Sequence, residues 1–273
     1  MDTLTQSLLG LCNIIKETNK DIVSDILDKY ENIPTSQKSI PALRKKLKEI
    51  YPNLFARSGL SIKEKELPLL SVSGGIKTDF VYSPCEKIIK IFSEEQKRRI
   101  EKLKKEIGIL FPISDYKHTF RVKDTRNFSH NAASRDDIKS IADLVGIRVV
   151  PNNTKLFLNM LVKFEEKFQK EASFKLNTFA YSEKEIVNKI GKYSVYYRAV
   201  HYYFLIDNFY AEVQLRTPDI DQWSTLHHDT IYKPKIPVSD EQKRRIMRFG
   251  KISNIVDYFD LIRYSSVRFK KYG

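Results

Sequence analysis

Cysteine is scarce in this sequence, which limits the kinds of site and fold that the chain can form. The 273 residues include two cysteines, Cys12 and Cys85, which lie far apart and do not have the close spacing of paired zinc ligands. A small secreted protein held together by disulfides needs more cysteines than this. We therefore expect a protein of a reducing compartment.

Long hydrophobic runs are also missing. No apolar stretch approaches the length of about 20 residues that a membrane-spanning helix requires. The amino terminus lacks both the basic start and the long apolar core of a secretory signal peptide. We expect a cytoplasmic protein with no membrane segment.

The sequence carries a strongly basic net charge. Of the net charge of +14, residues 1–84 contribute +2 and residues 85–273 contribute +12. Such a charge favours polyanionic partners, which include nucleoside triphosphates, RNA and anionic membrane surfaces. With 41% hydrophobic residues the chain can also bury a sizeable core.

The periodicity of apolar residues predicts an α/β (α+β) fold, a mixed and mainly antiparallel sheet flanked by helices. Helices are expected near 3–30, after Pro41, and near 85–107, 134–142, 154–171 and 218–229, and a basic amphipathic helix in the last forty residues. Strands are expected at 116–122, 147–150, 199–206 and 210–216, the last two joined by a turn at residues 207–208. A loop-rich stretch at 69–84 divides a helical amino-terminal region, residues 1–84, from a second domain, residues 85–273, that includes the basic helix.

The strand around residue 212 carries a candidate site. Alternation places Glu212, Gln214 and Arg216 on one face and two apolar residues, Val213 and Leu215, on the other. A carboxylate, an amide and a guanidinium in register suit metal and phosphate chemistry. A half-solvated structural strand shows the same alternation, so the pattern alone leaves both interpretations open.

Asp143 and Glu212 form a candidate carboxylate pair. Asp143 lies where the helix near 134–142 gives way to a strand, and Glu212 lies within a strand. Two carboxylates can bind Mg²⁺ while phosphates fill its remaining positions. Either residue is equally compatible with a surface acid.

Four segments occur in a specific order: DLVGIR at 143–148, YRAVH at 197–201, EVQLRT at 212–217, and a segment that begins at Trp223. Together with Arg121 and Lys123 upstream, they resemble the ordered motifs of the RelA/SpoT nucleotidyltransferase family, the alarmone synthetases. The resemblance extends over about residues 85–260. It implies an enzyme that uses Mg²⁺ and transfers the β,γ-pyrophosphate of ATP to the 3′-hydroxyl of GDP or GTP, which gives AMP and (p)ppGpp.

The resemblance also implies roles for individual residues. Asp143 and Glu212 would be catalytic and would bind Mg²⁺, Glu212 also helping to deprotonate the attacking hydroxyl. ATP would be bound by three basic residues, Arg121, Lys123 and Arg148. Tyr197 would stack on the acceptor base, with His201 beside the acceptor ribose or phosphates. Gln214 and Arg216 would support the metal site and the phosphates, whereas Trp223 is expected to pack in the core.

The chain departs from the family pattern at several positions. Asn127 and Asn131 stand where the family usually has Ser and Lys, and Tyr196 precedes Tyr197 where the family has Gly. Some relatives are toxins that attach pyrophosphate to the 3′-CCA end of tRNA, and the basic charge would also suit that acceptor. Residues 1–84 would then be a neutralising or sensing element, or simply additional helices on the core. A further alternative is a binding protein without catalytic activity. Another is a metal-dependent phosphohydrolase, which the adjacent pair His228 and Asp229 suggests.

Overall fold

The computed structural model describes residues 20–51, 86–122, 145–168, 175–187, 194–206, 209–232 and 237–269. Several sequence predictions lie outside these residues: the amino-terminal part of the first helix, the loop-rich stretch at 69–84, the helix near 134–142 and the turn at 207–208. Asn127 and Asn131 also lie outside them.

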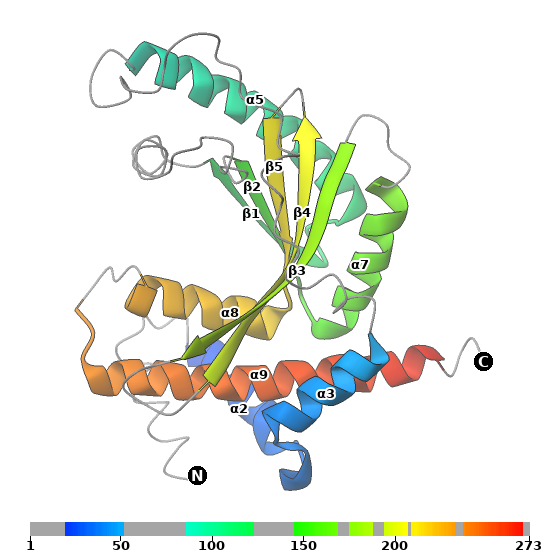
Figure 1. Cartoon of the computed structure of the whole chain (residues 1–273), viewed down its shortest axis with the longest axis vertical. Coiled ribbons are helices and arrows are strands. Elements are labelled where there is room, and N and C mark those ends of the chain that lie inside the picture. The colour runs from blue at the N-terminus through cyan, green and yellow to red at the C-terminus, as the bar shows by residue number, and fades with distance from the viewer. Residues whose placement is uncertain are drawn as a thin grey trace.

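The described strands form one mixed sheet in the order β1-β2-β5-β4-β3 (Figure 1). These are β1 (Tyr116–Val122), β2 (Val145–Pro151), β3 (Lys175–Val187), β4 (Ser194–Ile206) and β5 (Phe209–Leu215). The pair β2 and β5 is parallel, and the other three pairs are antiparallel. The predicted fold class, a mixed and mainly antiparallel sheet flanked by helices, is confirmed.

Strand β3 was not predicted from the sequence. It is an edge strand that pairs with β4 alone among the described strands, and it carries Lys175, Glu183, Lys184 and Glu185. Charged residues are common on edge strands because they discourage pairing with other chains. They also interrupt the apolar alternation by which a strand is recognised in a sequence.

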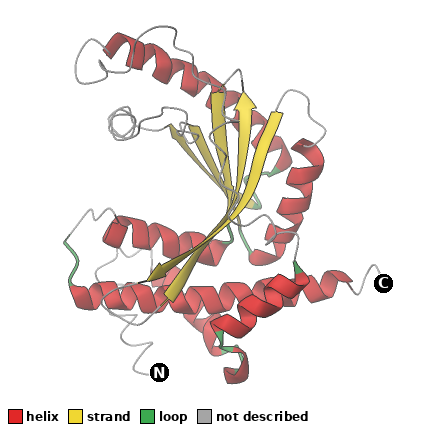
Figure 2. Ribbon diagram, in the orientation of Figure 1, coloured by secondary structure: helices red, strands yellow, loops and turns green. Residues whose placement is uncertain are grey.

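Helices α5 (Glu86–Leu110) and α7 (Thr154–Phe168) lie beside the sheet (Figure 2). The helical spacing of Ile100, Leu103 and Ile107 places all three in the core, and none is more than 4% exposed. Phe164 of α7 packs against Tyr202 of β4, with 4.1 Å between the ring centroids. The helices predicted near 85–107 and 154–171 are confirmed over their described residues.

Helix α8 (Pro218–His227) follows β5 and continues into a π-helical turn, His228–Tyr232. Its Trp223 is completely buried, and its indole Nε1 donates a hydrogen bond to the carbonyl oxygen of Ile246, 3.2 Å away. The expectation that Trp223 packs in the core is confirmed.

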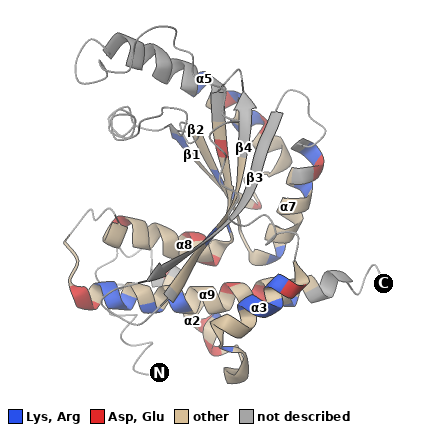
Figure 3. Ribbon diagram, in the orientation of Figure 1, with Lys and Arg blue, Asp and Glu red and all other residues tan. Residues whose placement is uncertain are grey.

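The long carboxy-terminal helix α9 (Asp240–Phe269) is not the amphipathic helix that the sequence predicted. Every residue from 252 to 258 is buried, including Asn254 and Asp257, so the middle of α9 contacts protein on all sides. Several of its basic residues lie in the first turns (Figure 3), where Lys243 pairs with Asp240, and Arg245 with Glu241. Arg263 and Arg268 lie near the other end of α9, so its basic residues flank a buried middle.

Two amino-terminal helices pack on α9, although they lie far from it in the sequence (Figure 1). They are α2 (Lys20–Glu31) and α3 (Ile40–Ile50), joined through a short 3-10 turn, Thr35–Gln37. The buried residues Val23, Ile26 and Leu27 of α2 belong to the same hydrophobic core as the sheet. The division into two domains at residue 84 stays a prediction. Within the described ranges, no helix combines the length and apolar character needed to span a bilayer.

Candidate active site

The strand register brings predicted site residues from four strands to one face of the sheet. In one row, Arg121 of β1 lies opposite Gly146 of β2, which lies opposite Glu212 of β5. In the next row, Arg148 lies opposite Gln214, and Gln214 lies opposite His201 of β4. Residues that face one another across paired strands project to the same side of the sheet.

The alternation along β5 is confirmed. Val213 and Leu215 are fully buried on the core side of the strand. Gln214 Nε2 donates a hydrogen bond to Glu212 Oε2 over 2.8 Å, and Arg216 Nη2 donates one to Gln214 Oε1 over 2.9 Å. The three polar side chains on the opposite face therefore form a continuous chain of hydrogen bonds.

Glu212 is held on both of its carboxylate oxygens. Besides the bond from Gln214, its Oε1 lies 2.7 Å from His201 Nδ1. An ionised carboxylate only accepts hydrogen bonds, so His201 carries the proton on Nδ1 when it pairs with ionised Glu212. A carboxylate oxygen has two lone pairs, so an oxygen that accepts one hydrogen bond can also bind a cation. The rotamer of Glu212 is fixed in advance of any ligand.

Arg216 connects the hydrogen-bonded side chains of β5 to β4 and to helix α8. Its Nη2 donates to the hydroxyl oxygen of Tyr197 at 2.6 Å, and its guanidinium carbon lies 4.9 Å from the centroid of the Tyr197 ring. Its Nη1 donates to Ser224 Oγ at 2.9 Å and to Asp221 Oδ1 at 3.2 Å. Because Arg216 is buried and its terminal nitrogens have protein partners, it orients Gln214 and Tyr197.

A second guanidinium shares the same carboxylate. Arg148 Nη1 lies 3.1 Å from Asp221 Oδ1. Burial lowers the pKa of Arg148 and the neighbouring Arg216 lowers it further, whereas Asp221 opposes both effects. Because the ordinary pKa of arginine lies far above neutrality, Arg148 stays charged in spite of this decrease. Two cations around one anion leave a net positive site, which suits phosphate.

Gly146 lies within β2. A Cβ atom built on it would lie 3.9 Å from Arg121 Nε, an ordinary van der Waals contact. The Arg121 side chain therefore lies close to the glycine, in the same row as Glu212.

Two of the predicted site residues, Lys123 and Asp143, lie outside the described residues. The structure brings together the other seven: Arg121, Arg148, Tyr197, His201, Glu212, Gln214 and Arg216. Their chemical roles stay predictions.

Asp221 and Ser224 are site residues that the sequence analysis missed. Both are buried in α8, and both bind Arg216. The available signal was the acidic first turn after Thr217 and Pro218, since a carboxylate there projects back toward the strand that precedes the helix. The pair His228 and Asp229, in contrast, bind one another at 3.0 Å and are partly exposed.

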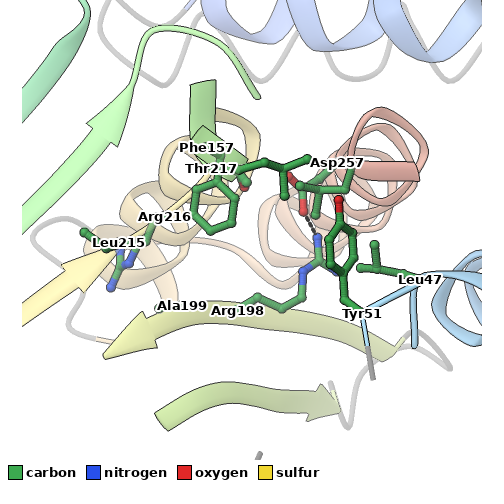
Figure 4. Close-up of a pocket in the computed structure, with 11 residues that line it drawn as sticks. Leu47, Tyr51, Phe157, Arg198, Ala199, Leu215, Arg216, Thr217 and Asp257 are labelled. Atoms are coloured by element: carbon green, nitrogen blue, oxygen red, sulfur yellow. Dashed lines mark hydrogen bonds and ion pairs between the residues drawn. The ribbon is translucent and has the colours of Figure 1, made fainter. Parts of the chain in front are cut away.

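A small cavity lies behind the end of β5 (Figure 4). Its volume is about 20 Å³, and Arg198 of β4 forms an ion pair with Asp257 of α9 at its wall. A ligand pocket measures about 300–1,000 Å³, whereas one water needs only about 10–15 Å³. This cavity can hold a water molecule and is too small for a nucleotide.

Residues 116–236 match the family model described as "Region found in RelA / SpoT proteins". We call this matched segment the RelA/SpoT region. The match confirms the resemblance inferred from the ordered motifs. The RelA/SpoT region extends from β1 to just beyond the π-helical turn, and it contains all nine predicted site residues together with Asp221 and Ser224.

Solved structures with a similar arrangement include two proteins from Bacillus subtilis. Small alarmone synthetase 1 aligns with a TM-score of 0.46 at 17% identity over 68% of this chain and 99% of its own. Small alarmone synthetase 2 gives a TM-score of 0.45 at 16% identity over the same shares. A GTP pyrophosphokinase family protein from Streptococcus pneumoniae gives 0.38 at 21% identity over 63% of this chain and 87% of its own. No curated protein sequence gives a significant match.

Proposed function

We propose that the protein is an ATP-dependent pyrophosphotransferase that transfers the β,γ-pyrophosphate of ATP to the 3′-hydroxyl of GDP or GTP. One observation carries the proposal: within the RelA/SpoT region, Glu212, His201, Gln214, Arg216 and Tyr197 form one hydrogen-bonded network on a single sheet face. Arg148, which shares Asp221 with Arg216, adds a second guanidinium beside this network.

In this reaction the acceptor oxygen attacks the β-phosphorus of ATP, AMP leaves, and the hydroxyl proton must be removed. Glu212 is the candidate acceptor for that proton, because its carboxylate is held in one orientation by His201 and Gln214. Phosphoryl-type transfer needs little covalent chemistry from the protein, so positioning and charge stabilisation supply most of the acceleration.

The arginines divide between orientation and substrate contact. Arg216 has its terminal nitrogens engaged within the protein, whereas the side chain of Arg148 is 29% exposed. Arg121 is exposed at the end of β1. From their exposure we expect Arg148 and Arg121 to contact ATP, and the partly exposed ring of Tyr197 to contact the acceptor base.

Mg²⁺ would be held by Glu212 and Asp143. The donor chemistry of Glu212 fits, since Mg²⁺ in phosphotransferases is bound through one or two carboxylates and the substrate phosphates. The ion would neutralise charge that develops on the pyrophosphate. In the described part of the chain no group of three or more His, Cys, Asp or Glu side chains gathers as a metal cluster.

The test is to incubate the protein with Mg²⁺ and ATP labelled in the β-phosphate, and to offer GDP, GTP and bulk tRNA separately. We expect label on GDP or GTP, with AMP formed in equal amount. Label on tRNA alone, lost when the 3′ end is removed, would replace the proposal by tRNA modification. Transfer to none of the three would contradict both.

A further inference from the structure

Lys29 reaches from the amino-terminal helix α2 into the RelA/SpoT region. Its Nζ lies 3.2 Å from Oδ1 of Asp219, a residue 190 positions later in the chain. The same Nζ also lies 2.8 Å from Asp25, one turn earlier on α2. The Asp25 carboxylate is 57% exposed, whereas that of Asp219 is 0% exposed. The pair with Asp219 is therefore less screened by solvent than the pair with Asp25.

Asp219 depends on this partner because, apart from Lys29, the charged side chains with the largest effect on its pKa are acidic. Thr154, at the start of α7, donates a weak hydrogen bond to Asp219 Oδ2 at 3.4 Å. Asp257 and Asp260 of α9 act on Asp219 as like charges. Burial raises the pKa of Asp219 to about 6, with Lys29 opposing the increase. An isolated buried carboxylate would be strongly unfavourable at neutral pH, so the Lys29 ammonium is what permits ionised Asp219 there.

The first turn of α8 contains both Asp219 and Asp221. Asp221 is the carboxylate that binds Arg148 and Arg216, and its backbone N–H donates to the carbonyl of Thr217 over 3.0 Å. A shift of this helical turn would move Asp221 with it, because two residues of one helix turn are rigidly connected.

We propose that Lys29 is a positioning residue: it neutralises buried Asp219 and so fixes the first turn of α8, from which Asp221 aligns Arg148 and Arg216. The amino-terminal helices thereby complete the site. The kinetic part of this proposal rests on the proposed function.

The decisive variant is Lys29→Met in the full chain, which keeps much of the aliphatic length and removes the charge. At pH 8 we expect kcat to fall about tenfold while KM for ATP and for the acceptor changes less than about threefold, since misalignment affects the transition state most. The deficit should shrink as the pH falls through 6, because Asp219 is then protonated in both proteins and needs no counter-charge.

A second variant separates charge from packing. In Lys29→Met/Asp219→Asn the neutral amide needs no ammonium, so kcat at pH 8 should return to within about threefold of the wild type. A matched control is Asp25→Asn, which removes the exposed partner of the same lysine and should leave kcat within about twofold. If Lys29→Met has the kcat of the wild type at pH 8, the proposal is overturned. The same follows if kcat of the double variant is as low as that of Lys29→Met.

Hydrogen exchange gives a readout that does not depend on catalysis. Lys29→Met should accelerate exchange of the Asp221 amide about tenfold or more at pH 8 and leave the amides of β2 and β5 unchanged. If the wild type transfers no pyrophosphate, the proposed function fails and exchange alone decides. Unchanged protection at Asp221 would then overturn the role of Lys29.

Discussion

Among single residues, Arg216 makes a large number of hydrogen bonds within the site. Its guanidinium donates to four different side chains, from β4, β5 and α8, and it is 6% exposed. A buried charge with this number of partners is costly to disturb, because removing it leaves several polar groups unsatisfied. Arg216 is therefore the structural centre of the network, and we expect the more exposed Arg148 to contact phosphate.

Tyr197 binds Arg216 through its hydroxyl group, and we propose that its ring stacks on the acceptor base; two substitutions separate these roles. Tyr197→Phe removes the hydroxyl that accepts the Arg216 hydrogen bond but keeps the ring. We expect KM for the acceptor to change less than about threefold. Tyr197→Ala removes the ring as well, and because stacking of a base on an aromatic ring is worth about 1–3 kcal/mol, that KM should rise about tenfold or more. Steady-state kinetics on both variants test this, and an equal KM in the two would argue against stacking.

At the scale of elements, the packing of α8 on α9 limits which residues can occupy position 250. A Cβ on Gly250 would lie 2.2 Å from Nε1 of Trp223, which is far too close. Gly250→Ala should therefore lower the free energy of unfolding by about 1–3 kcal/mol, in spite of the higher helix propensity of alanine.

Gly108 in α5 provides the matched control, since nothing lies within 4 Å of its Cβ position. The same substitution there should raise the free energy of unfolding by about 0.5–1 kcal/mol, the ordinary gain for alanine in a helix. Urea unfolding of both variants measures the difference. A Gly250→Ala protein as stable as Gly108→Ala would show that the α8–α9 contact is looser than described.

The elements also indicate what a single sequence can predict. Strands β1, β2, β4 and β5 were predictable because apolar residues alternate or cluster in them, and the alternation at 212–216 correctly placed three site residues on one face. Strand β3 was missed because its charges mask the pattern. The buried character of α9 was missed because its flanking basic residues suggested a solvated face, whereas partners distant in sequence cover its middle. The pairing of Asp221 with two arginines depends on strand register, which local patterns do not fix.

At the scale of the whole molecule, the amino-terminal helices share the core of the RelA/SpoT region. Ile26 of α2 is fully buried in the same hydrophobic cluster as the sheet residues. Ile26→Ala should lower the free energy of unfolding of the whole protein by about 2–5 kcal/mol. Fluorescence of Trp223, the single tryptophan, and far-UV circular dichroism should then give coincident transitions at the lower midpoint. An unchanged Trp223 transition would mean that residues 1–84 unfold as a separate unit.

If the network on the face of β5 transfers pyrophosphate as we propose, Glu212→Gln should abolish most of the activity. The amide is nearly isosteric, but it accepts no proton and carries no charge for a metal ion. The measurement is the single-turnover rate of label transfer from β-labelled ATP at saturating ATP and acceptor, alongside the urea midpoint. We expect a rate at least about 100-fold below that of the wild type, with the protein still folded. A folded Glu212→Gln protein that transfers pyrophosphate at the wild-type rate would contradict this proposal.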